Sequence, residues 1–533
     1  MTVYVPEEFT EHEADVLRRY FTNLDGPVFA LVNLPEVVKG ALFARYSRSP
    51  KSLRRLFLDE FVGDLDIEGD QTVDATMGLE RAEELYEKVF FEYGDDSVAQ
   101  LGGVHLACEQ ASNILTKVLE WGRLMSYLEQ STRYISYDAR LGGRYRFYRD
   151  PDVLSSRFGT RYVGDMDRMF DSYSLLLTKV TDHVRATVAQ DPRDSDFIYR
   201  QATRAKALDA VRGVLPAASL SNVGMYGSGQ SFEALLLRMR SHPLPEARHY
   251  ADLMLHELRK VIPSFLRRVD LADRGGRWSD YLADTRNDTA AIVDRLFGGT
   301  PVDQVPSVQL IDFDPQAEDK LLAAICYSHS NLPESQLLDR VRLLSPADRQ
   351  ALMSAYIGQR DNRRHKPGRA FERVDYRFDV LSDYGAFRDL QRHRLLTIEW
   401  QSVTPNHGYV RPELIEEAGM ADIFDDAMIR SASLYDALHE EFPQQASYAV
   451  SMAYRMRYTM QFNAREAIHL LELRSSPQGH PAYRRIALEM HRLIGEQAGH
   501  TVVANAMNHM TTEVPELERL EAERRAEHRR QQS

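Results

Sequence analysis

The stretch QRHRLLTIEWQS, Gln391–Ser402, has a weaker copy in the first half of the chain. There, Gly122–Ser131 reads GRLMSYLEQS, against HRLLTIEWQS in His393–Ser402. Four aligned pairs are identical: Arg123/Arg394, Leu124/Leu395, Gln130/Gln401 and Ser131/Ser402. A polar, arginine-bearing loop that occurs twice predicts that one structural unit is present twice in the chain.

A second pair of segments supports this duplication. Arg240–Pro243 follows Phe232–Ala234 in the first half, as Arg474–Pro477 follows Arg465–Ala467 in the second. Glycine and proline residues then punctuate the region between the two copies, as expected of a connection between domains. We therefore expect a first domain at 1–275, a linker at 276–306, a second domain at 307–515 and a charged tail at 516–533.

Length and composition set limits on fold, partners and location. A chain of 533 residues is too long for one compact core. Its formal charge of −13 argues against a nucleic-acid or membrane-surface partner. The two cysteines, Cys108 and Cys326, provide neither a disulfide framework nor a zinc ligand set, which fits a reducing cytoplasm. We expect neither a signal peptide nor a membrane span, because no apolar segment is long enough.

The spacing of apolar residues predicts a helix-rich chain with a few short strands, which fits the α+β class. We expect helices at 79–91, 98–119, 454–474 and 482–494, and three further long helices up to about residue 267. Strands are expected at 133–138, 144–150 and Val308–Phe313. Cys108 falls within the helix expected at 98–119, where we expect it to be buried rather than reactive.

Candidate functional residues of the second half lie in the quoted stretch and in a later helix. Arg392-His393-Arg394 suits a ligand with several anionic oxygens, although a triplet that solvates a helix end is an alternative. Asn463 and Arg465 begin a helix on which His469 shares the face of Arg465. Arg474 is out of phase with Arg465, so the two would face different sites. The alternatives are an N-cap at Asn463 and a satisfied, partly buried His469.

In the first half, Glu129–Arg133 crowds a carboxylate, two hydroxyls and a guanidinium into five residues. Arg212 lies one turn before Pro216 in AVRGVLP, where the proline ends a helix. An ion pair between an arginine and a glutamate in a turn is the alternative interpretation of the first cluster.

Taken together, these segments resemble the flavin-dependent thymidylate synthases, whose signature is RHR-x-x-S-x-N-x-x-S-x-R-Y. That family also has a Gly-His-x-Ser/Thr segment, an Arg before Leu-Pro, and an Asn-Ala-Arg helix that ends in a catalytic Arg. The second half keeps the residues Arg392, His393, Arg394, Ser402, Asn463, Arg465, His469 and Arg474. It departs from the pattern at Thr397, Glu399, Trp400 and Thr404, and Ser447–Ser451 replaces the segment before Leu-Pro.

The first half departs from the pattern at other positions. Trp121-Gly122-Arg123 replaces RHR, Gly94–Ser97 has lost the histidine, and Ser228–Gln230 replaces Asn-Ala-Arg. The first half keeps Ser126, Glu129, Ser131, Arg133, Tyr134 and Arg212. In the family one nucleotide site is shared between subunits, so these losses are complementary. We therefore expect one composite site in which Glu129, Ser131, Arg133 and Arg212 face Arg392 and Arg474.

The resemblance implies an α+β fold of two tandem thymidylate synthase-like domains, each helix-rich with a small mixed or antiparallel sheet. It implies a FAD-dependent methyltransferase that converts dUMP to dTMP with methylenetetrahydrofolate and NADPH. It implies dUMP contacts from Glu129, Gln130, Ser131, Thr132, Arg133, Arg212 and Arg392. It implies FAD contacts from Glu129, His393, Arg394, Asn463, Arg465 and His469. Arg474 would be catalytic, and no metal is implied.

The sequence leaves alternatives for the function and for two basic segments. The chain could instead be a flavoprotein of the same fold acting on another nucleotide, or a non-catalytic nucleotide-binding relative. Because the family is homotetrameric, we expect a homodimer that forms a pseudo-tetramer of four domains. The basic segments at 45–56 and 363–369 could contact cofactor phosphate or could be solvated loops.

Overall fold

The computed structural model describes residues 4–62, 100, 102–513 and 515–532, which divide into two compact units. Unit 1 comprises Met1–Ser174, Leu215–Val302 and Ile429–Val450. Unit 2 comprises Leu175–Val214, Asp303–Met428 and Ser451–Ser533. Each unit therefore takes in one segment from the other half of the sequence, and neither is a contiguous range such as 1–275 or 307–515.

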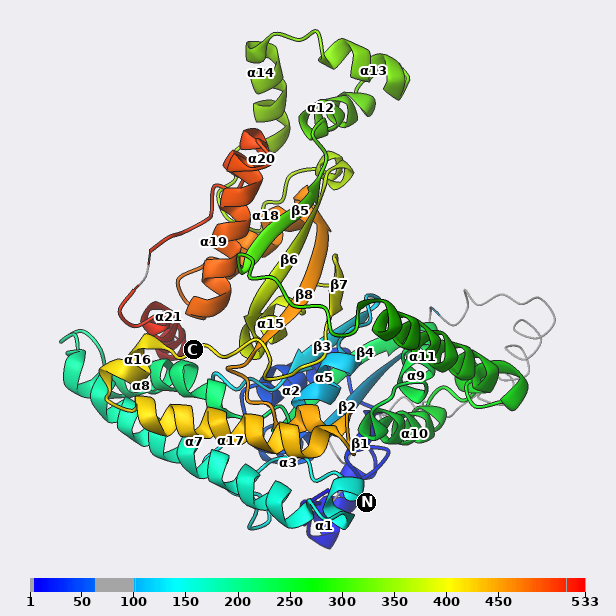
Figure 1. Ribbon diagram of the computed structural model, residues 1–533, viewed down its shortest axis with the longest axis vertical. Coiled ribbons are helices and arrows are strands. Elements are labelled where there is room, and N and C mark those ends of the chain that lie inside the picture. The colour runs from blue at the N-terminus through cyan, green and yellow to red at the C-terminus, as the bar shows by residue number, and fades with distance from the viewer. Residues whose placement is uncertain (1–3, 63–99, 101, 514, 533) are drawn as a thin grey trace. The chain divides into compact units, whose positions relative to one another are not determined.

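Unit 1 is built on an antiparallel sheet whose four described strands have the order β1-β2-β4-β3. The strands are β1 (Val28–Leu31), β2 (Gly103–Ser112), β3 (Met125–Glu129) and β4 (Leu220–Ser228) (Figure 1). β2 lies inside the sheet and most of its side chains are buried on both faces, Cys108 among them. Burial raises the pKa of the Cys108 thiol, which fits the expected role of Cys108 as a small buried hydrophobe.

Some of the helices of unit 1, α5 and α9 among them, begin at capping side chains. Ser112 accepts a hydrogen bond from the backbone of Leu115 at the start of α5, and Ser228 caps α9 in the same way. The elements are α1 (Glu11–Leu17), α2 (Glu36–Tyr46), α3 (Leu53–Glu60), α5 (Asn113–Leu119), α6 (Pro151–Ser155), α9 (Gly229–Arg240), α10 (Pro245–Arg259), α11 (Arg277–Phe297) and the short turns η5 (Ser264–Leu266), η6 (Ala272–Gly276) and η8 (Gln445–Ala449). An aromatic core cluster lies under α1 to α3, around Phe21, Phe29 and Phe57.

Unit 2 repeats this plan. Its antiparallel sheet has the strand order β5-β6-β8-β7, with β5 (Val308–Phe313), β6 (Asp375–Asp383), β7 (Thr397–Trp400) and β8 (Arg455–Asn463). In β8, Met456, Tyr458, Met460 and Phe462 are buried, and the residues between them are more exposed. This alternation is typical of a strand with one face on a core.

The helices of unit 2 lie around its sheet, with α19 alongside β5 (Figure 1). They are α8 (Asp196–Val211), η4 (Arg212–Val214), α12 (Ala317–Tyr327), α13 (Glu334–Val341), α14 (Pro346–Ile357), η7 (Arg369–Arg373), α15 (Tyr384–Leu390), α16 (Glu413–Glu417), α18 (Ala464–Arg474), α19 (Pro481–Glu496), α20 (Thr501–Ala506) and α21 (Leu520–Gln532). Two helices run from one unit's residues into the other's, α7 (Gly159–Thr187) and α17 (Ala421–His439).

The two sheets confirm the duplication and the α+β class. Equivalent strands occupy equivalent places in the two sheets. Each copy of the quoted stretch follows a short helix and contains an edge strand: α5 and β3 in unit 1, α15 and β7 in unit 2. A backbone hydrogen bond that occurs in both units aligns their sequences just before β4 and β8. Within unit 1, Ala218 N donates to Tyr448 O at 3.0 Å, and within unit 2, Ala453 N donates to Gly213 O at 2.8 Å. Gly213 therefore corresponds to Tyr448, and Ala218 to Ala453.

Several predicted elements are wrong. The described part of the helix expected at 98–119 is strand β2 followed by α5, and the first half of that expected at 454–474 is strand β8. Long helices do precede residue 267, as expected, namely α7, α8 and α10, but the unpredicted strand β4 lies between α8 and α9. Residues 133–138 and 144–150 form no strand. The linker expected at 276–306 stays a prediction, and the 21-residue helix α11 lies within that range. The helix expected at 79–91 and the segment Gly94–Ser97 lie outside the described residues.

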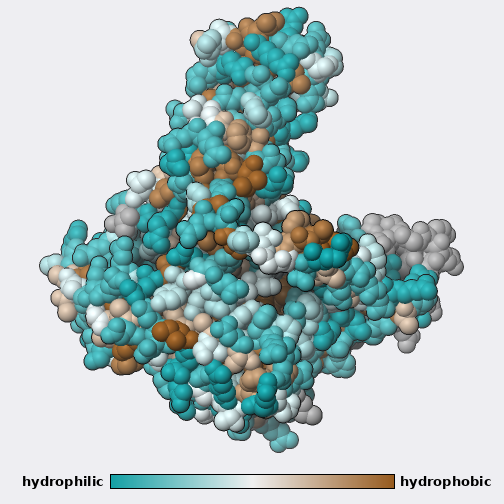
Figure 2. Space-filling model, in the orientation of Figure 1, coloured by the Kyte–Doolittle hydropathy of each residue, from teal (hydrophilic) through white to brown (hydrophobic). Residues whose placement is uncertain are grey.

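Other predictions are confirmed. β5 has the predicted bounds Val308–Phe313, and α19 covers the helix expected at 482–494. None of the described helices has both the length and the apolar composition that crossing a bilayer requires. On the face drawn in Figure 2, hydrophobic side chains lie scattered among hydrophilic ones.

Candidate functional site

A chain of polar contacts in unit 2 links the RHR segment to α18. Arg474, at the end of α18, donates from Nε to Nε2 of His393 at 3.0 Å. His393 lies 3.0 Å from Oε1 of Glu466 through Nδ1, and Nδ1 of His469 lies 3.2 Å from both oxygens of Glu466. Because an arginine nitrogen can only donate, Nε2 of His393 is the acceptor and Nδ1 carries its proton.

The electrostatics of these groups agree with that proton assignment. Burial lowers the pKa of His393 to about 4, so its imidazole is neutral near pH 7. Burial opposes ionisation of Glu466, but hydrogen bonds from His393 and His469 outweigh it and hold its pKa at about 2. The pKa of Arg474 is lowered by burial, whereas the Asp389 carboxylate acts in the opposite direction. Glu466 is therefore ionised beside a neutral His393.

Asp389, on α15, interacts with three arginines of unit 2. Its Oδ2 lies 3.3 Å from Nη1 of Arg212, its Oδ1 lies 3.8 Å from Nη1 of Arg392, and its charge acts on Arg474. Arg212 comes from the first half of the sequence and the other two from the second. The structure thus brings together three of the predicted site residues, Arg212, Arg392 and Arg474, within one unit.

The first turn of α15 leaves room for Arg212 because it contains a glycine. A Cβ atom at Gly385 would lie 3.3 Å from Nε and Nη2 of Arg212 and 3.0 Å from Oδ1 of Asp383. Asp383 caps α15 by accepting a hydrogen bond from Ala386 N at 2.9 Å. Burial raises the pKa of Asp383, and the guanidinium of Arg212 partly offsets this. Gly385 therefore permits the close approach of Arg212 to the helix.

Residues 129–133 belong to unit 1, so their predicted approach to Arg392 and Arg474 stays a prediction. Glu129 is buried and lies 3.1 Å from Nζ of Lys117. Gln130 is also buried and donates to Ser49 O at 2.7 Å, and Ser131 N donates to Ser47 O at 3.2 Å. Thr132 is buried, and the Arg133 backbone donates to Oγ of Ser131 at 3.3 Å. The predicted substrate loop thus packs on the basic segment at 45–56.

That basic segment is held largely by acidic partners of unit 1. Arg45 pairs with Glu60, Lys51 with Asp59, and Arg55 with Glu7 and Glu13. Arg54 is fully buried and lies 3.1 Å from Oε2 of Glu109. These ion pairs favour a structural role for most of its cations.

In unit 2, the predicted FAD residues surround the start of α18. Asn463 caps the helix by accepting a hydrogen bond from Glu466 N at 2.9 Å, which confirms the N-cap alternative. Arg465 donates to Pro367 O at 2.9 Å and lies 3.3 Å from Oε1 of Glu372, so it faces the basic segment at 363–369 and not Arg474. Arg394 is exposed in the turn before β7. The predicted phase difference between Arg465 and Arg474 is therefore confirmed.

His393, Glu466 and His469 form the kind of cluster that can hold a metal ion, since their ligand atoms lie within 4.8 Å of one another. A metal on Nδ1 of His393 would place the proton on Nε2, facing the Nε donor of Arg474. Metal-bound histidines direct their second nitrogen to an acceptor, not to a donor. The geometry at Arg474 therefore disfavours a metal at this cluster.

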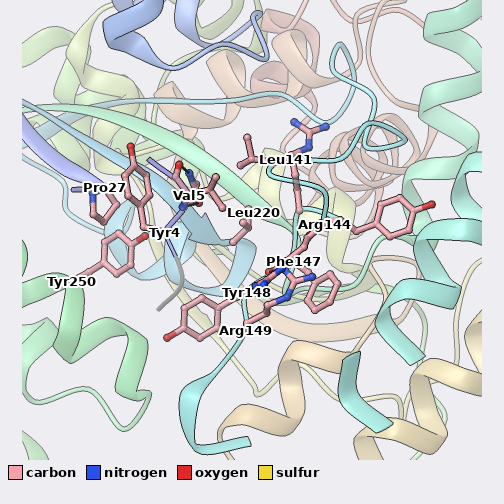
Figure 3. A pocket seen from close by; sticks show the side chains of 13 residues that line it. Tyr4, Val5, Pro27, Leu141, Arg144, Phe147, Tyr148, Arg149, Leu220 and Tyr250 are labelled. Atoms are coloured by element: carbon pink, nitrogen blue, oxygen red, sulfur yellow. Dashed lines mark hydrogen bonds between the residues drawn. The ribbon is translucent and has the colours of Figure 1, made fainter. Parts of the chain in front are cut away.

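A small cavity of about 30 Å³ lies in unit 1, beside the segment 144–149 that was expected to be a strand. Figure 3 shows the side chains around it, with Tyr4, Pro27 and Tyr250 on one side and Phe147 and Arg149 on the other. Its volume holds only a few water molecules. The cavity is therefore too small for a nucleotide or a flavin.

Two residues of this site were missed by the sequence reasoning, Asp389 and Glu466. The sequence carried a signal for each. Val118 is the counterpart of Asp389 in the first copy, so a carboxylate has replaced a buried apolar residue there. Glu466 lies three residues before His469 on a helix, a spacing that places both on one face.

Comparisons with known proteins agree with this arrangement. A family model described as thymidylate synthase complementing protein matches residues 44–264 and 309–498. The UPF0159 protein of Chlamydia pneumoniae is 39% identical over 486 residues, covering 90% of this chain and 91% of that protein. The UPF0159 protein Ta1429 of Thermoplasma acidophilum is 32% identical over 512 residues, covering 91% of this chain and 97% of that protein. The chain therefore belongs to the thymidylate synthase complementing protein family, the flavin-dependent thymidylate synthase family, and carries the family's region twice.

Proposed function

We propose that the chain is a FAD-dependent thymidylate synthase that converts dUMP to dTMP at a site to which both halves contribute. The observation that carries this proposal is the carboxylate of Asp389, which interacts with Arg212 from the first half and with Arg392 and Arg474 from the second. Three guanidinium groups around one carboxylate leave an excess of positive charge. Such an excess suits the dianionic phosphate of a nucleotide.

Arg474 would bind and activate the uracil ring. Its Nε is held by His393, and its guanidinium also interacts with Tyr483 of α19, so two neighbouring side chains fix its position. A guanidinium at the imide edge would stabilise the N3-deprotonated ring and raise the electron density at C5. This activation requires no enzyme nucleophile, and the buried Cys108, with its raised thiol pKa, is unsuited to act as one.

The donor set around α18 fits FAD. Arg465 and the basic segment 363–369 lie together at the start of this helix, where backbone N–H groups and cations suit a pyrophosphate. His393, Arg394, Asn463 and His469 would hold the rest of the cofactor. When bound, FAD would supply the hydride that reduces the one-carbon unit from methylenetetrahydrofolate, and NADPH would return the electrons.

As the resemblance implies, residues 129–133 would also contact the nucleotide. Gln130, Ser131, Thr132 and Arg133 offer backbone and side-chain donors of the kind that bind phosphate. Glu129 lies 3.1 Å from Nζ of Lys117, and its carboxyl group would act as an acceptor for nucleotide or cofactor hydroxyls. The role of residues 129–133 in this proposal rests on the resemblance and on their chemistry.

We further propose that the chain forms a homodimer, which would give four family-type domains per assembly. On α11, Trp278, Tyr281 and Phe297 are exposed, and association commonly covers exposed aromatic side chains of this kind. Light scattering on the purified chain tests this proposal. A monomer at micromolar concentration would contradict it.

The test of the reaction is release of tritium from C5 of labelled dUMP, with FAD, methylenetetrahydrofolate and NADPH present. Release that depends on all three would support the proposal. Protein that binds FAD but releases no tritium would favour a flavoprotein acting on another nucleotide. Protein that takes up no FAD would favour a non-catalytic relative.

A further inference from the structure

Three arginines of unit 1 gather where α9 ends. Arg238 lies in the last turn of α9, Arg248 near the start of α10 and Arg286 in the middle of α11. Both α10 and α11 pack against α9 (Figure 1). All three arginines act electrostatically on the imidazole of His242, just beyond the end of α9. We call Arg238, His242, Arg248 and Arg286 the α9-end cluster.

Two of these arginines bind the backbone at the end of α9. Nη1 of Arg248 donates to His242 O at 2.6 Å and to Pro243 O at 2.8 Å. Nη2 of Arg286 donates to Ser241 O. Because these carbonyls belong to consecutive residues, the two guanidinium groups converge on one turn of the chain. The carbonyls at a helix C-terminus attract cations, which accounts for the position of the two side chains but does not neutralise their charges.

No carboxylate pairs with these guanidinium groups in the part of unit 1 that the structure describes. Within it, Arg238, Arg248 and Arg286 form no ion pair with an acidic side chain. Asp252, one turn beyond Arg248 on α10, pairs with Arg240 instead. The whole chain carries a formal charge of −13, so an unpaired group of three positive charges is unusual in it.

The pKa values of the cluster show the same imbalance. Burial and the charges of the three arginines lower the pKa of His242 to about 4, so its imidazole is neutral near pH 7. Burial lowers the pKa of Arg286, and the charge of Arg248 lowers it further. Burial also lowers the pKa of Arg238, with Tyr127 acting in the opposite direction. None of these shifts has an acidic side chain of the described residues among its causes.

The corresponding arginine of unit 2 has acidic neighbours. Arg248 corresponds to Arg484, because each is the third residue after the proline that begins its helix, α10 or α19. Arg484 also binds the end of the helix before it, donating from Nε to Ser475 O at 3.0 Å. The charges of Glu518 and Glu513 act on Arg484 and oppose the effect of burial on its pKa. In unit 1 the equivalent arginine has another arginine beside it where unit 2 has these acids.

That second arginine is supplied by α11. This helix lies between the two regions of the chain that match the family, so Arg286 is an addition to the duplicated unit. The addition brings a charge to a place that is already positive, which raises the electrostatic free energy of the protein alone. An anion bound between the helices would reverse the sign of this contribution.

We propose that the α9-end cluster binds a small anion of the pyrophosphate class. Phosphoryl oxygens and guanidinium N–H groups form short, charge-assisted hydrogen bonds, often in bidentate pairs. Two linked phosphoryl groups carry more charge and reach further than one, so they suit guanidinium groups that come from three helices. The site does not depend on the proposed reaction, because none of its residues is assigned to dUMP or FAD.

Calorimetric titration of the full-length protein with pyrophosphate, without divalent metal ions, tests this site. We expect saturable binding that is tighter than the binding of inorganic phosphate. It should persist when excess dUMP occupies the proposed active site. Titration with ADP distinguishes two sources of the diphosphate group: tighter binding than that of pyrophosphate would identify an organic diphosphate as the ligand, and weaker binding would identify the free anion.

Substitutions at Arg286 separate its charge from its structural hydrogen bond. Arg286→Gln removes the charge and keeps an amide donor for Ser241 O. It should weaken pyrophosphate binding about tenfold or more, as expected for loss of a charged hydrogen bond. Arg286→Lys keeps the charge and should weaken binding less. Arg248→Gln is a second, independent variant and should also weaken binding.

The matched control is Arg295→Gln, an exposed position on the same helix outside the cluster, which should bind pyrophosphate as the wild type does. Thermal unfolding checks that each variant folds. The proposal is overturned if pyrophosphate shows no saturable binding, if inorganic phosphate binds as tightly, or if excess dUMP abolishes the binding. It is also overturned if Arg286→Gln and Arg248→Gln bind pyrophosphate as tightly as Arg295→Gln.

Discussion

Nε of Arg474 donates to Nε2 of His393 at 3.0 Å, so the last residue of α18 is bonded to the centre of the RHR segment. The two residues lie far apart in sequence and come from different motifs. Glu466 accepts a hydrogen bond from Nδ1 of His393. This bond holds the imidazole in the tautomer whose Nε2 can accept a hydrogen bond from Arg474. The orientation of the predicted catalytic arginine is therefore set by a histidine and a glutamate.

Replacement of Arg474 tests its assigned role. The three N–H groups of a lysine diverge from one nitrogen, so they cannot reproduce the planar fork with which a guanidinium would hold His393 and pair with the uracil edge. Arg474→Lys and Arg474→Ala are both expected to lower C5 tritium release from dUMP by about a hundredfold or more, as loss of a transition-state donor commonly does. Arg240→Ala is the control, because Arg240 ends the equivalent helix α9 and pairs with Asp252. Activity retained in Arg474→Ala would refute the role.

The pKa of His393 predicts a pH dependence of stability. Its folded value of about 4 lies below its ordinary 6.5, so the unfolded chain takes up the proton first on acidification. The stability that rests on the neutral imidazole is complete above about pH 6.5 and is lost as the pH falls towards 4, at no more than about 1.4 kcal/mol per pH unit. The Glu466 carboxylate, whose pKa is about 2, stays ionised through this range.

His393→Gln isolates this effect, because an amide also offers one donor to Glu466 and one acceptor to Arg474. The free energy of unfolding in urea, measured at pH 7 and at pH 5, should fall less in this variant than in the wild type. The exposed His256, replaced in the same way, is the control. An equal fall in the wild type and in His393→Gln would contradict the prediction.

How far the sequence predicts this molecule depends on how each signal arises. β5 was found because its apolar residues alternate, and α19 because its amphipathic period is unbroken. The sequence predicts a helix in place of β8. Met456, Tyr458, Met460 and Phe462 do alternate as in a strand, but α18 begins directly after β8, so the strand pattern runs into the helix pattern without a break. β2 is buried on both faces, and a continuous apolar run does not distinguish a central strand from a buried helix.

The candidate site was predicted in part for a similar reason. The complementary losses in the two copies identified Arg212, Arg392 and Arg474, which the structure places in one unit. They did not identify Asp389, because an acid that contacts arginines from distant segments has no local motif; its one signal is the contrast with Val118 at the aligned position of the first copy. They also could not show that 175–214 belongs to unit 2, since an exchange of segments leaves the sequence pattern unchanged.

Gly385 provides a test of the position of Arg212. In Gly385→Ala the new methyl group would lie 3.3 Å from Nε and Nη2 of Arg212, so the guanidinium must move. We expect a loss of about 1–3 kcal/mol in the free energy of unfolding and weaker binding of dUMP.

Gly164→Ala is the control, because Gly164 lies in α7 with nothing within 4 Å of its added Cβ. There the alanine should stabilise the helix by roughly 0.5–1 kcal/mol. Equal dUMP affinity in Gly385→Ala and the wild type would contradict the prediction.

The carboxyl of Glu246 predicts the opposite pH dependence in unit 1. Burial raises its pKa to about 7 from an ordinary 4.5, so its contribution to stability is present below about pH 4.5 and is lost as the pH rises through 7. Tyr448→Phe removes one of the donors that favour the carboxylate, at 2.7 Å. This should raise the pKa of Glu246 further and cost about 1–3 kcal/mol above pH 7, where the carboxylate would be less well satisfied. The loss should be smaller at pH 5, where the carboxyl is protonated.

Urea unfolding at pH 5 and at pH 8 measures the loss at each pH, and replacement of the exposed Tyr281 by Phe is the control. A cost in Tyr448→Phe that is the same at both pH values would show that the phenol only fills space, and that Glu246 does not titrate in this range.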